Sequence, residues 1–314
     1  MTDSSFEKKY LNKKVLLTGG SGFIGGRLKK RLLQIGAVVY SLDNRPAAAQ
    51  TPNEIQCDIR NAEALNAAVS GISPEIVFHL AARVDRAQDP ALIKPMLEVN
   101  LFGAVNLFGS LRTVPSCRSI VVSGTAEEYG RALPPFLESY REDPVGPYSF
   151  SKICVSYLAS MFFKVYSLPV IVLRPTLAYG PVQEPEMFIP ALITALMRGE
   201  KFSMTHGEQT RDFIYVDDLV DAYLKAGIAG SGFGEVFNIG SGTPYKIKDV
   251  AHKIAALLKK EPLLDVGGKN YRTAEIMEYY ADISRARKIL GWTPVTGLEE
   301  GLKLTLKDYM DRRC

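Results

Sequence analysis

Short apolar runs alternate with longer segments of mixed polarity through the first 175 residues of the chain. Each run is too short for a buried helix and is typical of a buried strand. The strands are predicted at 15–17, 37–42, 54–57, 75–79, 119–123 and 169–174, and the helices at 23–35, 62–69, 90–111 and 148–166. This alternation predicts an α/β fold, a doubly wound parallel sheet with right-handed crossovers.

The pattern changes after Arg174, where prolines gather at 175, 181, 185 and 190. Two further strands are predicted at 211–215 and 236–239, and helices at 189–198, 217–229, 247–259, 283–290 and 298–310. We expect a sheet domain of residues 1–174 plus 212–240. The remaining residues, 175–211 plus 241–314, are expected to form a smaller, mostly helical lobe over the strand ends, where ligands of open α/β sheets bind.

Three glycines, Gly19, Gly22 and Gly25, stand between the first strand and the first helix. Their missing side chains let phosphates approach the backbone, and the unpaired N–H groups of the helix start point at such a ligand. An ordinary tight turn would carry the same glycines. The turn favours a pyrophosphate cradle, because an acid follows it at the distance expected of a dinucleotide fold.

That acid is Asp43, which ends the second strand 24 residues after Gly19. A carboxylate in this place accepts hydrogen bonds from the adenosine ribose diol and repels a 2′-phosphate, so the sequence favours NAD over NADP. Arg45, two residues after Asp43, weakly favours NADP, because its positive charge could meet a 2′-phosphate. A solvated carboxylate at a strand end is the alternative interpretation.

Composition narrows the class of protein further. Of 314 residues, 46% are apolar and 23% charged, which is ordinary for a soluble globular protein. The net charge of +4 comes without a long basic run, so we do not expect a nucleic-acid partner. We find no apolar signal core and no 18-residue apolar segment, and therefore expect no membrane. The unpaired spacing of Cys57, Cys117, Cys154 and Cys314 indicates free thiols in a reducing cytoplasm, and the scattered histidines indicate no metal site.

Tyr148 and Lys152 lie four residues apart and therefore on one face of a predicted helix. A cation beside a phenol favours the phenolate and lowers its pKa, so Tyr148 is a candidate general acid–base for a sugar hydroxyl. The spacing alone is weak evidence, because Tyr10 and Lys14 repeat it where they can only be structural. Thr125, which follows the strand at 119–123, could hold the same substrate oxygen.

Motifs in a fixed order cover nearly the whole chain. They are TGGSGFIG at 18–25, CDI at 57–59, HLAA at 79–82, NLFG at 100–103, YSFSK at 148–152, RPTLAYGP at 174–181, RDFIYVDD at 211–218, FNIG at 237–240, ADIS at 281–284 and WTP at 292–294. In these motifs the chain resembles the extended short-chain dehydrogenases/reductases, the group that contains nucleotide-sugar epimerases, dehydratases and 4-ketoreductases. The resemblance implies a Rossmann-type sheet and a nucleotide-diphosphate sugar as substrate.

The resemblance also implies roles for single residues. Thr125 would orient the sugar oxygen, Tyr148 would exchange its proton, and Lys152 would hold the nicotinamide ribose. The implied substrate contacts are Thr125, Tyr179, Arg211 and Arg272. The implied cofactor contacts are Gly19, Gly22, Phe23, Ile24, Gly25, Asp43, Asn44, Arg45, Asp58, Ile59, Leu80, Ala81, Ala82, Asn100, Ser123, Tyr148, Lys152 and Pro175.

Departures from the family pattern leave the reaction open. Glu127 matches a carboxylate that 4,6-dehydratases use at C5, but Ala126 replaces the acid that often precedes it, and Leu177 replaces a common substrate-binding asparagine. Glu127 is as compatible with a solvated loop position as with a catalytic one. We rank a 4-epimerase first, a 4-keto-6-deoxyhexose reductase second and a 4,6-dehydratase third. A non-catalytic dinucleotide sensor is remote, because Tyr148 and Lys152 are both present.

The helices predicted at 90–111 and 148–166 carry more apolar surface than one sheet face needs. In the family that the chain resembles, these two helices pair with their copies in a two-fold dimer. We therefore expect a homodimer through them, which would bury the excess apolar surface. Coverage by the C-terminal lobe is the alternative.

Overall fold

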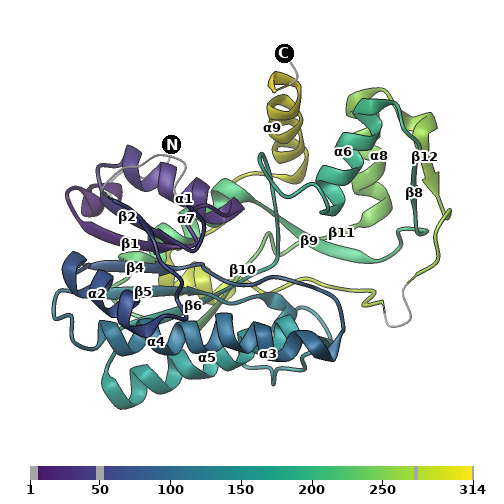
Figure 1. Ribbon diagram of the computed structural model, residues 1–314. Coiled ribbons are helices and arrows are strands. Elements are labelled where there is room, and N and C mark those ends of the chain that lie inside the picture. The colour runs from purple at the N-terminus through teal and green to yellow at the C-terminus, as the bar shows by residue number, and fades with distance from the viewer. Residues whose placement is uncertain (1–5, 47–52, 272–274, 313–314) are drawn as a thin grey trace.

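Seven parallel strands form the main sheet of the protein, in the order β10-β6-β5-β4-β1-β2-β3 (Figure 1). The computed structural model describes residues 6–46, 53–271 and 275–312. The strands of this sheet are β1 (Lys14–Thr18), β2 (Val38–Asp43), β3 (Glu54–Gln56), β4 (Ile76–His79), β5 (Ser119–Ser123), β6 (Val170–Pro175) and β10 (Val236–Ile239). The strand order and parallel pairing confirm the predicted Rossmann-type fold.

The strand order reverses at β1, between β2 on one side and β4 on the other. Thr18 and His79 end these neighbouring strands, and Thr18 Oγ1 lies 2.8 Å from His79 Nδ1. Burial lowers the pKa of His79 to about 3, so the imidazole is neutral. The carboxyl ends of β1 and β4 thus form a switch point, which is where open α/β sheets bind ligands.

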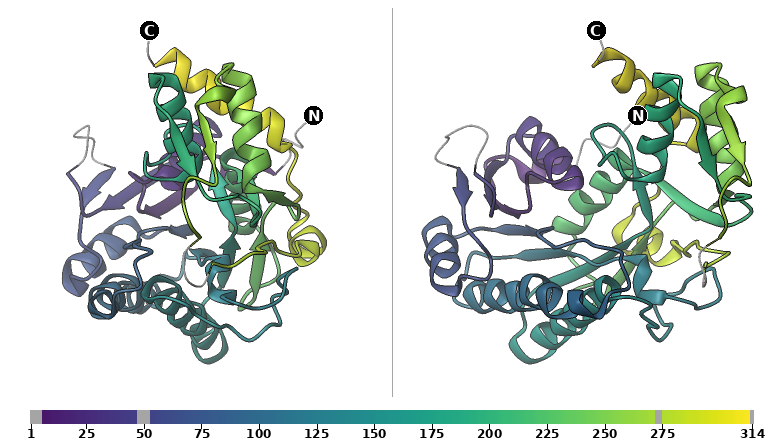
Figure 2. Two further views of the ribbon diagram at one scale, coloured as in Figure 1. Left: turned by 90° about the vertical axis from the view of Figure 1, so that its right-hand side faces the viewer. Right: turned by 45° about the vertical axis from the view of Figure 1, so that its right-hand side comes forward.

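Helices cover both faces of the main sheet (Figures 1 and 2). The first face is covered by α1 (Phe23–Gln34) and α7 (Val216–Gly227), and the second by α2 (Ala62–Ile72), α4 (Gly103–Leu111) and α5 (Pro147–Tyr166). Strand β1 shows how the sequence specifies both layers. Val15 and Leu17 pack into the core below α1 and α7, whereas Leu16 packs into the core on the opposite face. The apolar run Val15-Leu16-Leu17 is what a sheet buried on both faces requires.

The predicted helix at 90–111 is helical throughout, but its geometry changes along its length. It runs through η2 (Pro90–Leu92), α3 (Ile93–Met96), the π-helical η3 (Leu97–Phe102) and α4. The prediction that the chain has no 18-residue apolar segment is wrong. By length and composition alone, the helical run Pro90–Leu111 could cross a membrane. Part of its apolar character is explained by packing, because a third of the apolar window is buried in the protein. Leu107 and Phe108 are fully buried against the sheet, in the same core as Val77 of β4.

The second lobe is built on two small sheets. The first contains β7 (Leu177–Tyr179), β9 (Thr210–Tyr215) and β11 (Pro244–Lys246), and the second β8 (Phe202–Met204) and β12 (Leu264–Val266). The strand predicted at 211–215 is present, but it pairs with β7 and β11 and not with the main sheet. Helices α6 (Phe188–Arg198), α8 (Ile247–Leu258) and α9 (Leu298–Asp311) pack on these strands around a core of their own. The division of the chain into domains stays a prediction.

Short helical turns complete the fold. They are η1 (Glu7–Tyr10), η4 (Ala126–Tyr129), η5 (Glu261–Leu263) and the π-helical η6 (Ala286–Leu290). Among them, η4 matters most for function, because it begins just after Thr125 at the carboxyl end of β5.

The cysteines of the described segments are free thiols. Cys57 is buried, and Cys117 and Cys154 are half-buried. Burial raises the pKa of Cys117 to about 12, which keeps this sulfur protonated. Cys314 lies outside the described residues.

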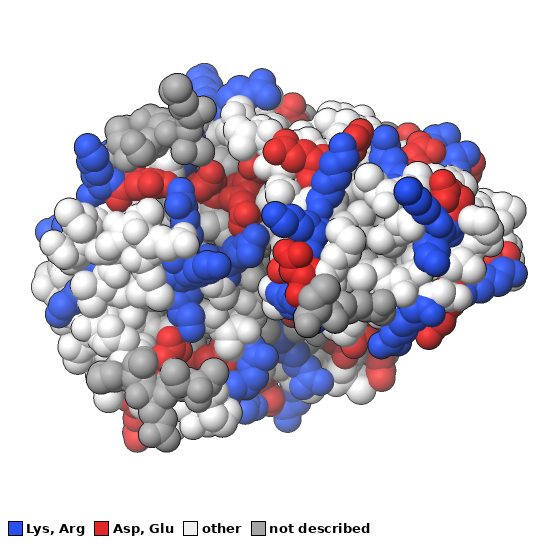
Figure 3. All heavy atoms as spheres, turned by 90° about the horizontal axis from the view of Figure 1, so that it is seen from above, with Lys and Arg blue, Asp and Glu red and all other residues white. Residues whose placement is uncertain are grey.

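Charges of both signs are interspersed over the face of the molecule seen in Figure 3. Many are paired. Arg27 lies 2.7 Å from Asp217, and Lys29 lies 2.9 Å from Glu54.

Candidate active site

A cavity of about 730 Å³ opens at the carboxyl ends of β1, β2, β4, β5 and β6. We call its two parts the glycine end, with the Gly19–Gly25 turn, Asp43 and Asp58, and the tyrosine end, with Ser123, Thr125, Tyr148 and Lys152. The cavity wall includes most predicted site residues: Gly19, Gly22, Phe23, Ile24, Gly25, Asp43, Asn44, Arg45, Asp58, Ile59, Leu80, Ala81, Ala82, Ser123, Thr125, Glu127, Tyr148, Lys152 and Pro175.

The glycine end has the form of a phosphate cradle. Helix α1 begins at Phe23, its N-cap Gly22 supplies no side-chain cap, and its first turn carries no acid. Gly19 has a φ of +75°, and a Cβ there would lie 2.6 Å from the backbone nitrogen of Ala81. A Cβ at Gly25 would overlap the carbonyl oxygen of Gly19. The turn therefore needs glycine, and it leaves the helix N–H groups open to an anion, which fits the pyrophosphate of a dinucleotide.

Two acids line the glycine end, and each has an arginine beside it. The Asp43 carboxylate accepts hydrogen bonds from Ser21 Oγ and from the backbone nitrogen of Arg45, the latter at 3.1 Å. Although burial raises the pKa of Asp43, these hydrogen bonds leave it below its usual value. Asp58 lies 2.6 Å from Arg60. Both carboxylates are thus held in place at the ends of β2 and β3, where a ribose and an adenine could meet them.

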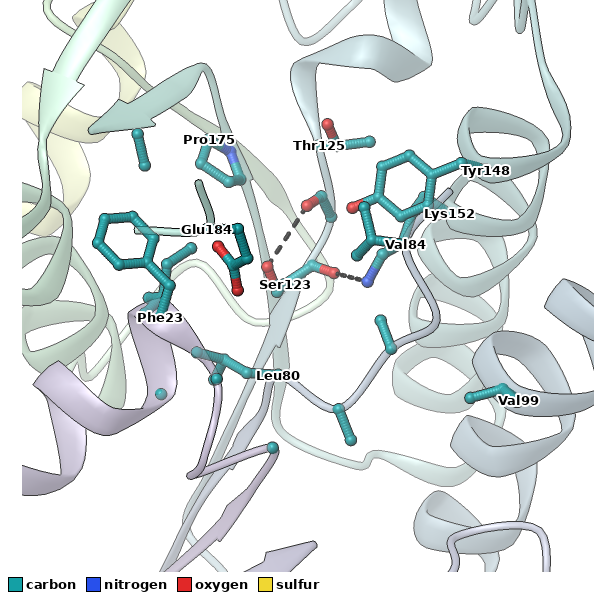
Figure 4. A pocket seen from close by; sticks show the side chains of 18 of the residues that line it. Phe23, Leu80, Val84, Val99, Ser123, Thr125, Tyr148, Lys152, Pro175 and Glu184 are labelled. Atoms are coloured by element: carbon teal, nitrogen blue, oxygen red, sulfur yellow. Dashed lines mark hydrogen bonds between the residues drawn. The ribbon is translucent and has the colours of Figure 1, made fainter. Parts of the chain in front are cut away.

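At the tyrosine end, α5 places Tyr148 and Lys152 on adjacent turns (Figure 4). Lys152 is 4% exposed, and its Nζ donates a hydrogen bond of 2.7 Å to the carbonyl oxygen of Ser123. The hydroxyl of Ser123 accepts in turn from Tyr223, at 2.7 Å. Burial lowers the pKa of Lys152 to about 8, although the charge of Glu128 opposes the fall. Lys152 is therefore a fixed cation that can lose its proton in mildly alkaline solution.

The prediction that Lys152 lowers the pKa of Tyr148 is wrong for the protein without a bound cofactor. The ammonium lies 5.9 Å from the centre of the Tyr148 ring and makes its hydrogen bond to Ser123. Burial raises the pKa of Tyr148, and the charge of Glu127 raises it further, while Arg86 opposes them. Desolvation disfavours the phenolate more than these surroundings favour it. In the protein by itself, Tyr148 is a neutral phenol.

Thr125 is the N-cap of η4, and its side chain lies on the same side of the pocket as Tyr148 (Figure 4). Its hydroxyl accepts from the backbone nitrogen of Glu127 at 3.2 Å, and its own backbone nitrogen donates to Glu128 Oε1 at 2.9 Å. This reciprocal capping fixes the backbone of Thr125. The hydroxyl keeps its proton available for a ligand.

An arginine that the sequence prediction missed holds Glu127. Arg86 Nε donates to Glu127 Oε1 at 2.8 Å, and Arg86 Nη1 lies 3.3 Å from the sulfur of Met187. Arg86 comes from the loop after β4, four residues beyond the HLAA motif. Its position past the carboxyl end of a central strand was a usable signal, because loops at that edge face the ligand.

Other cavity residues also went unpredicted. Glu184, Glu186, Met187 and Tyr279 line the wall from the second lobe. Glu184 points into the pocket between Pro175 and Ser123 (Figure 4). No periodicity in the sequence at 183–187 shows which of its side chains turns inward.

Three predicted contacts lie away from the cavity wall. Asn100 is 1% exposed and binds the backbone of Arg83 and, at 2.8 Å, the hydroxyl of Ser151, so it braces the loop after β4 against α5. Tyr179 is 1% exposed and donates to the carbonyl oxygen of Leu298 at 3.3 Å. It packs within the core of the second lobe.

Arg211, the third, contacts Glu275 and donates to the carbonyl oxygens of Thr210 and Ile276, both at 2.7 Å. Its guanidinium lies 6.0 Å from the centre of the Tyr279 ring, which does line the cavity. Arg272 lies outside the described residues. The ligand contacts of Arg211 and Arg272 stay predictions.

A Rossmann-type sheet with a Tyr–Lys pair above its dinucleotide groove is the architecture of a short-chain dehydrogenase/reductase. The family model described as "NAD dependent epimerase/dehydratase family" matches residues 15–240, which include both ends of the cavity. The chain therefore belongs to the NAD dependent epimerase/dehydratase family. The predicted relationship to nucleotide-sugar enzymes of the extended short-chain type is confirmed.

Relatives of two reaction types are similar to this chain over nearly its full length. A UDP-glucuronate 4-epimerase of Thermodesulfobacterium geofontis is 31% identical, with 93% of this chain and 94% of that protein covered. The structure of a UDP-glucose 4-epimerase from Thermotoga maritima with UDP-glucose matches at 28% identity and a TM-score of 0.87, over 96% of this chain and 99% of that chain. A dTDP-glucose 4,6-dehydratase from Bacillus anthracis in complex with NAD matches at 27% identity and a TM-score of 0.83, over 96% and 97% of the two chains. NAD is thus the cofactor of the family.

Proposed function

We propose that this protein is an NAD-dependent nucleotide-sugar 4-epimerase, which inverts C4 of a nucleotide-linked hexose without net use of the cofactor. The observation that carries the proposal is the tyrosine end of the cavity. A phenol, an ammonium and a hydroxyl converge there, while the neighbouring carboxylate of Glu127 is already bound by Arg86 at 2.8 Å.

The glycine end is suited to hold NAD. The N–H groups at the start of α1 would bind the pyrophosphate, Asp43 the adenosine ribose, and Asp58 with Ile59 the adenine. Arg45 contacts Asp43 and Ser21, so its guanidinium is engaged within the chain. When bound, NAD supplies the hydride acceptor and donor and, in its oxidised form, a positive charge.

The chain's own residues would handle the proton at the C4 oxygen. Thr125 would donate or accept a hydrogen bond at that oxygen, and Tyr148 would take its proton during oxidation and return it during reduction. Lys152, fixed on the Ser123 carbonyl, would hold the nicotinamide ribose and contribute positive charge. Because burial raises the pKa of Tyr148, it depends on added positive charge to act as a base.

A 4,6-dehydratase, ranked third from the sequence, becomes the second candidate ahead of the 4-ketoreductase, because Glu127 lines the cavity and several relatives are 4,6-dehydratases. Removal of a C5 proton would require Glu127 to act as a base while Arg86 binds it. Epimerisation makes no such demand, and Ala126 has no acid to share the task. These two points favour the epimerase.

We further propose that the substrate is a nucleotide-diphosphate sugar whose phosphates meet Arg211 and Arg272. The guanidinium of Arg211 lies 6.0 Å from the centre of the Tyr279 ring, which lines the cavity, and it contacts Glu275. Arg211→Ala should then raise KM for the nucleotide sugar more than it lowers kcat.

A homodimer through 90–111 and 148–166 is also proposed. These helices expose apolar side chains, including Phe102 at 55%, Tyr157 at 60% and Val165 at 62%. Exposed groups of this size are costly in a monomer, and a two-fold contact would cover them. Light scattering at micromolar concentration should give twice the mass of the chain, and a monomer would contradict the dimer. We expect this assembly in the cytoplasm.

Product analysis tests the proposed function. The purified protein is incubated with UDP-glucose, UDP-N-acetylglucosamine, UDP-glucuronate and dTDP-glucose, each with NAD, and the products are examined by NMR and mass spectrometry. An epimerase gives a product of unchanged mass and constant total NAD. A product lighter by one water would identify a dehydratase. In a second incubation, with a nucleotide 4-keto-6-deoxyhexose and added reduced cofactor, consumption of one reduced cofactor per sugar converted would identify a reductase.

A further inference from the structure

Glu128 is a fully buried acid directly beneath the reactive groups. It lies in η4, three residues after Thr125, and its side chain is 0% exposed. Buried carboxylates are rare and are retained where several partners satisfy them. The role proposed for Tyr148, Lys152 and Thr125 does not use Glu128, and it does not line the cavity.

Each oxygen of Glu128 has its own partners. Oε1 accepts from the backbone nitrogen of Thr125 at 2.9 Å. Oε2 accepts from the hydroxyl of Ser156 on α5 at 2.8 Å, and from Nε of Arg174 on β6 at 2.9 Å. One carboxylate thus ties together the turn that carries Thr125, the helix that carries Tyr148 and Lys152, and the central strand β6.

A second acid, Glu142, contacts the same arginine as Glu128 and can serve as a control for it. Glu142 Oε1 lies 2.6 Å from Arg174 Nη2, and Glu142 Oε2 accepts from Tyr157 at 3.0 Å. Glu142 therefore shares the arginine with Glu128 but makes no hydrogen bond to Thr125 among the described residues.

We propose that Glu128 is a positioning residue for the reaction: its carboxylate ties the turn that carries Thr125 to the helix that carries Tyr148 and Lys152, and it places a buried negative charge beneath them. The inference rests on the proposed function only in that Thr125, Tyr148 and Lys152 are taken as the reacting groups. It adds to the site a residue that contacts neither substrate nor cofactor.

Electrostatics support the second half of this role. The groups that face Lys152 and Tyr148 from the surrounding elements are Glu127 and Glu128 of η4, Arg86 of the loop after β4, His79 of β4 and Tyr223 of α7. Glu128 raises the pKa of Lys152 against the effect of burial, and it raises the pKa of Tyr148 together with burial and Glu127. Burial raises the pKa of Glu128 itself, while Arg174 and two hydrogen bonds stabilise the carboxylate form. Loss of the charge should therefore move both groups to lower pKa values.

Two substitutions separate position from charge. Glu128→Gln keeps the reach to Thr125 and removes the charge, so the whole pH profile of kcat/KM should move to lower pH by about half a unit or more. Glu128→Asp keeps the charge but shortens the reach, so kcat should fall by about tenfold to a hundredfold, with the pH profile and KM nearly unchanged. Glu142→Gln, the matched control, should alter neither.

The readouts distinguish this inference from the proposed function. The pH dependence of NAD affinity, followed by calorimetry, reports on Lys152 without turnover and should shift in Glu128→Gln as the activity profile does. Thermal unfolding verifies that each variant is folded; if Glu128→Gln does not fold, the Asp variant carries the test. Unshifted profiles in Glu128→Gln, or full kcat in Glu128→Asp, would overturn the inference, whereas a wild type without turnover would overturn the proposed function alone.

Discussion

The two ends of the cavity are built in different ways. The glycine end comes from contiguous stretches, with a strand, a turn and a helix in residues 14–34 and an acid at the end of the next strand. The tyrosine end is assembled from the end of β5, the start of η4 and α5. The loop after β4, the loop at 183–187 and Tyr279 line the cavity beside it, from positions far apart in sequence. The first end depends on local backbone geometry, and the second on tertiary packing. Single side chains at the tyrosine end can therefore be changed without disturbing the backbone turn of the glycine end.

The largest effect is expected from a substitution at the tyrosine end that leaves the glycine end unchanged. Tyr148→Phe removes only a hydroxyl, so turnover should fall by about 10²–10⁴-fold while NAD affinity and unfolding stay near wild type. Steady-state kinetics and calorimetry measure the two properties.

Tyr10→Phe is the matched control for that variant. Tyr10 is fully buried, and its hydroxyl donates to the carbonyl oxygen of Leu224 at 2.6 Å. Its loss should cost about 1 kcal/mol of unfolding free energy and leave turnover per folded molecule unchanged. The assignment of Tyr148 is wrong if Tyr10→Phe loses turnover and Tyr148→Phe does not.

The next largest effect is expected from a substitution at the glycine end. Asp43→Ala removes a charged hydrogen-bond acceptor, so NAD affinity should fall by about tenfold or more and the preference for NAD over NADP should narrow. Arg45→Ala, which removes the neighbouring arginine, should leave the preference for NAD intact. Titration of both variants with both cofactors makes the comparison. A wild type that prefers NADP would show that Arg45 outweighs Asp43.

A pH titration tests whether the positive charge of Lys152 contributes to NAD binding. Its pKa is lowered by burial to about 8, so the ammonium is present below that pH and is lost as the pH rises through it. NAD affinity and kcat/KM should therefore decline above about pH 8. In Lys152→Arg the charge persists, so the decline of NAD affinity should disappear. A wild-type affinity that stays constant to pH 10 would show that the charge of Lys152 does not hold the cofactor.

The sequence predicted the glycine end almost residue by residue, because glycine spacing, strand ends and helix starts are local features. It predicted Tyr148, Lys152 and Thr125 from motifs. It missed Arg86 and the ionic contacts of Glu128, since an ion pair between residues 41 or 46 positions apart leaves no periodic trace. It also expected a lowered Tyr148 pKa, because spacing shows that a cation is near but not that it is committed to Ser123.

The smallest expected effect concerns the carboxylate that separates the candidate reactions. Glu127→Gln preserves shape and removes basicity, and we expect it to retain turnover within about tenfold, because an epimerase needs no base at C5. Arg86→Lys, which keeps a positive charge beside Glu127, serves as a companion variant with a similarly small effect. Complete loss of turnover in Glu127→Gln, together with a 4-keto-6-deoxy product from the wild type, would favour the dehydratase.

The position of a deuterium label tests the central claim most directly. The wild type is given a nucleotide hexose deuterated at C4, with NAD and no added reduced cofactor, and the label is located by NMR. An epimerase lifts the label from C4 and returns it to C4, so the account predicts an inverted product that keeps its deuterium at C4 and has an unchanged mass. Transfer of the label to C6 with loss of water, or no turnover of any nucleotide sugar offered, would contradict it.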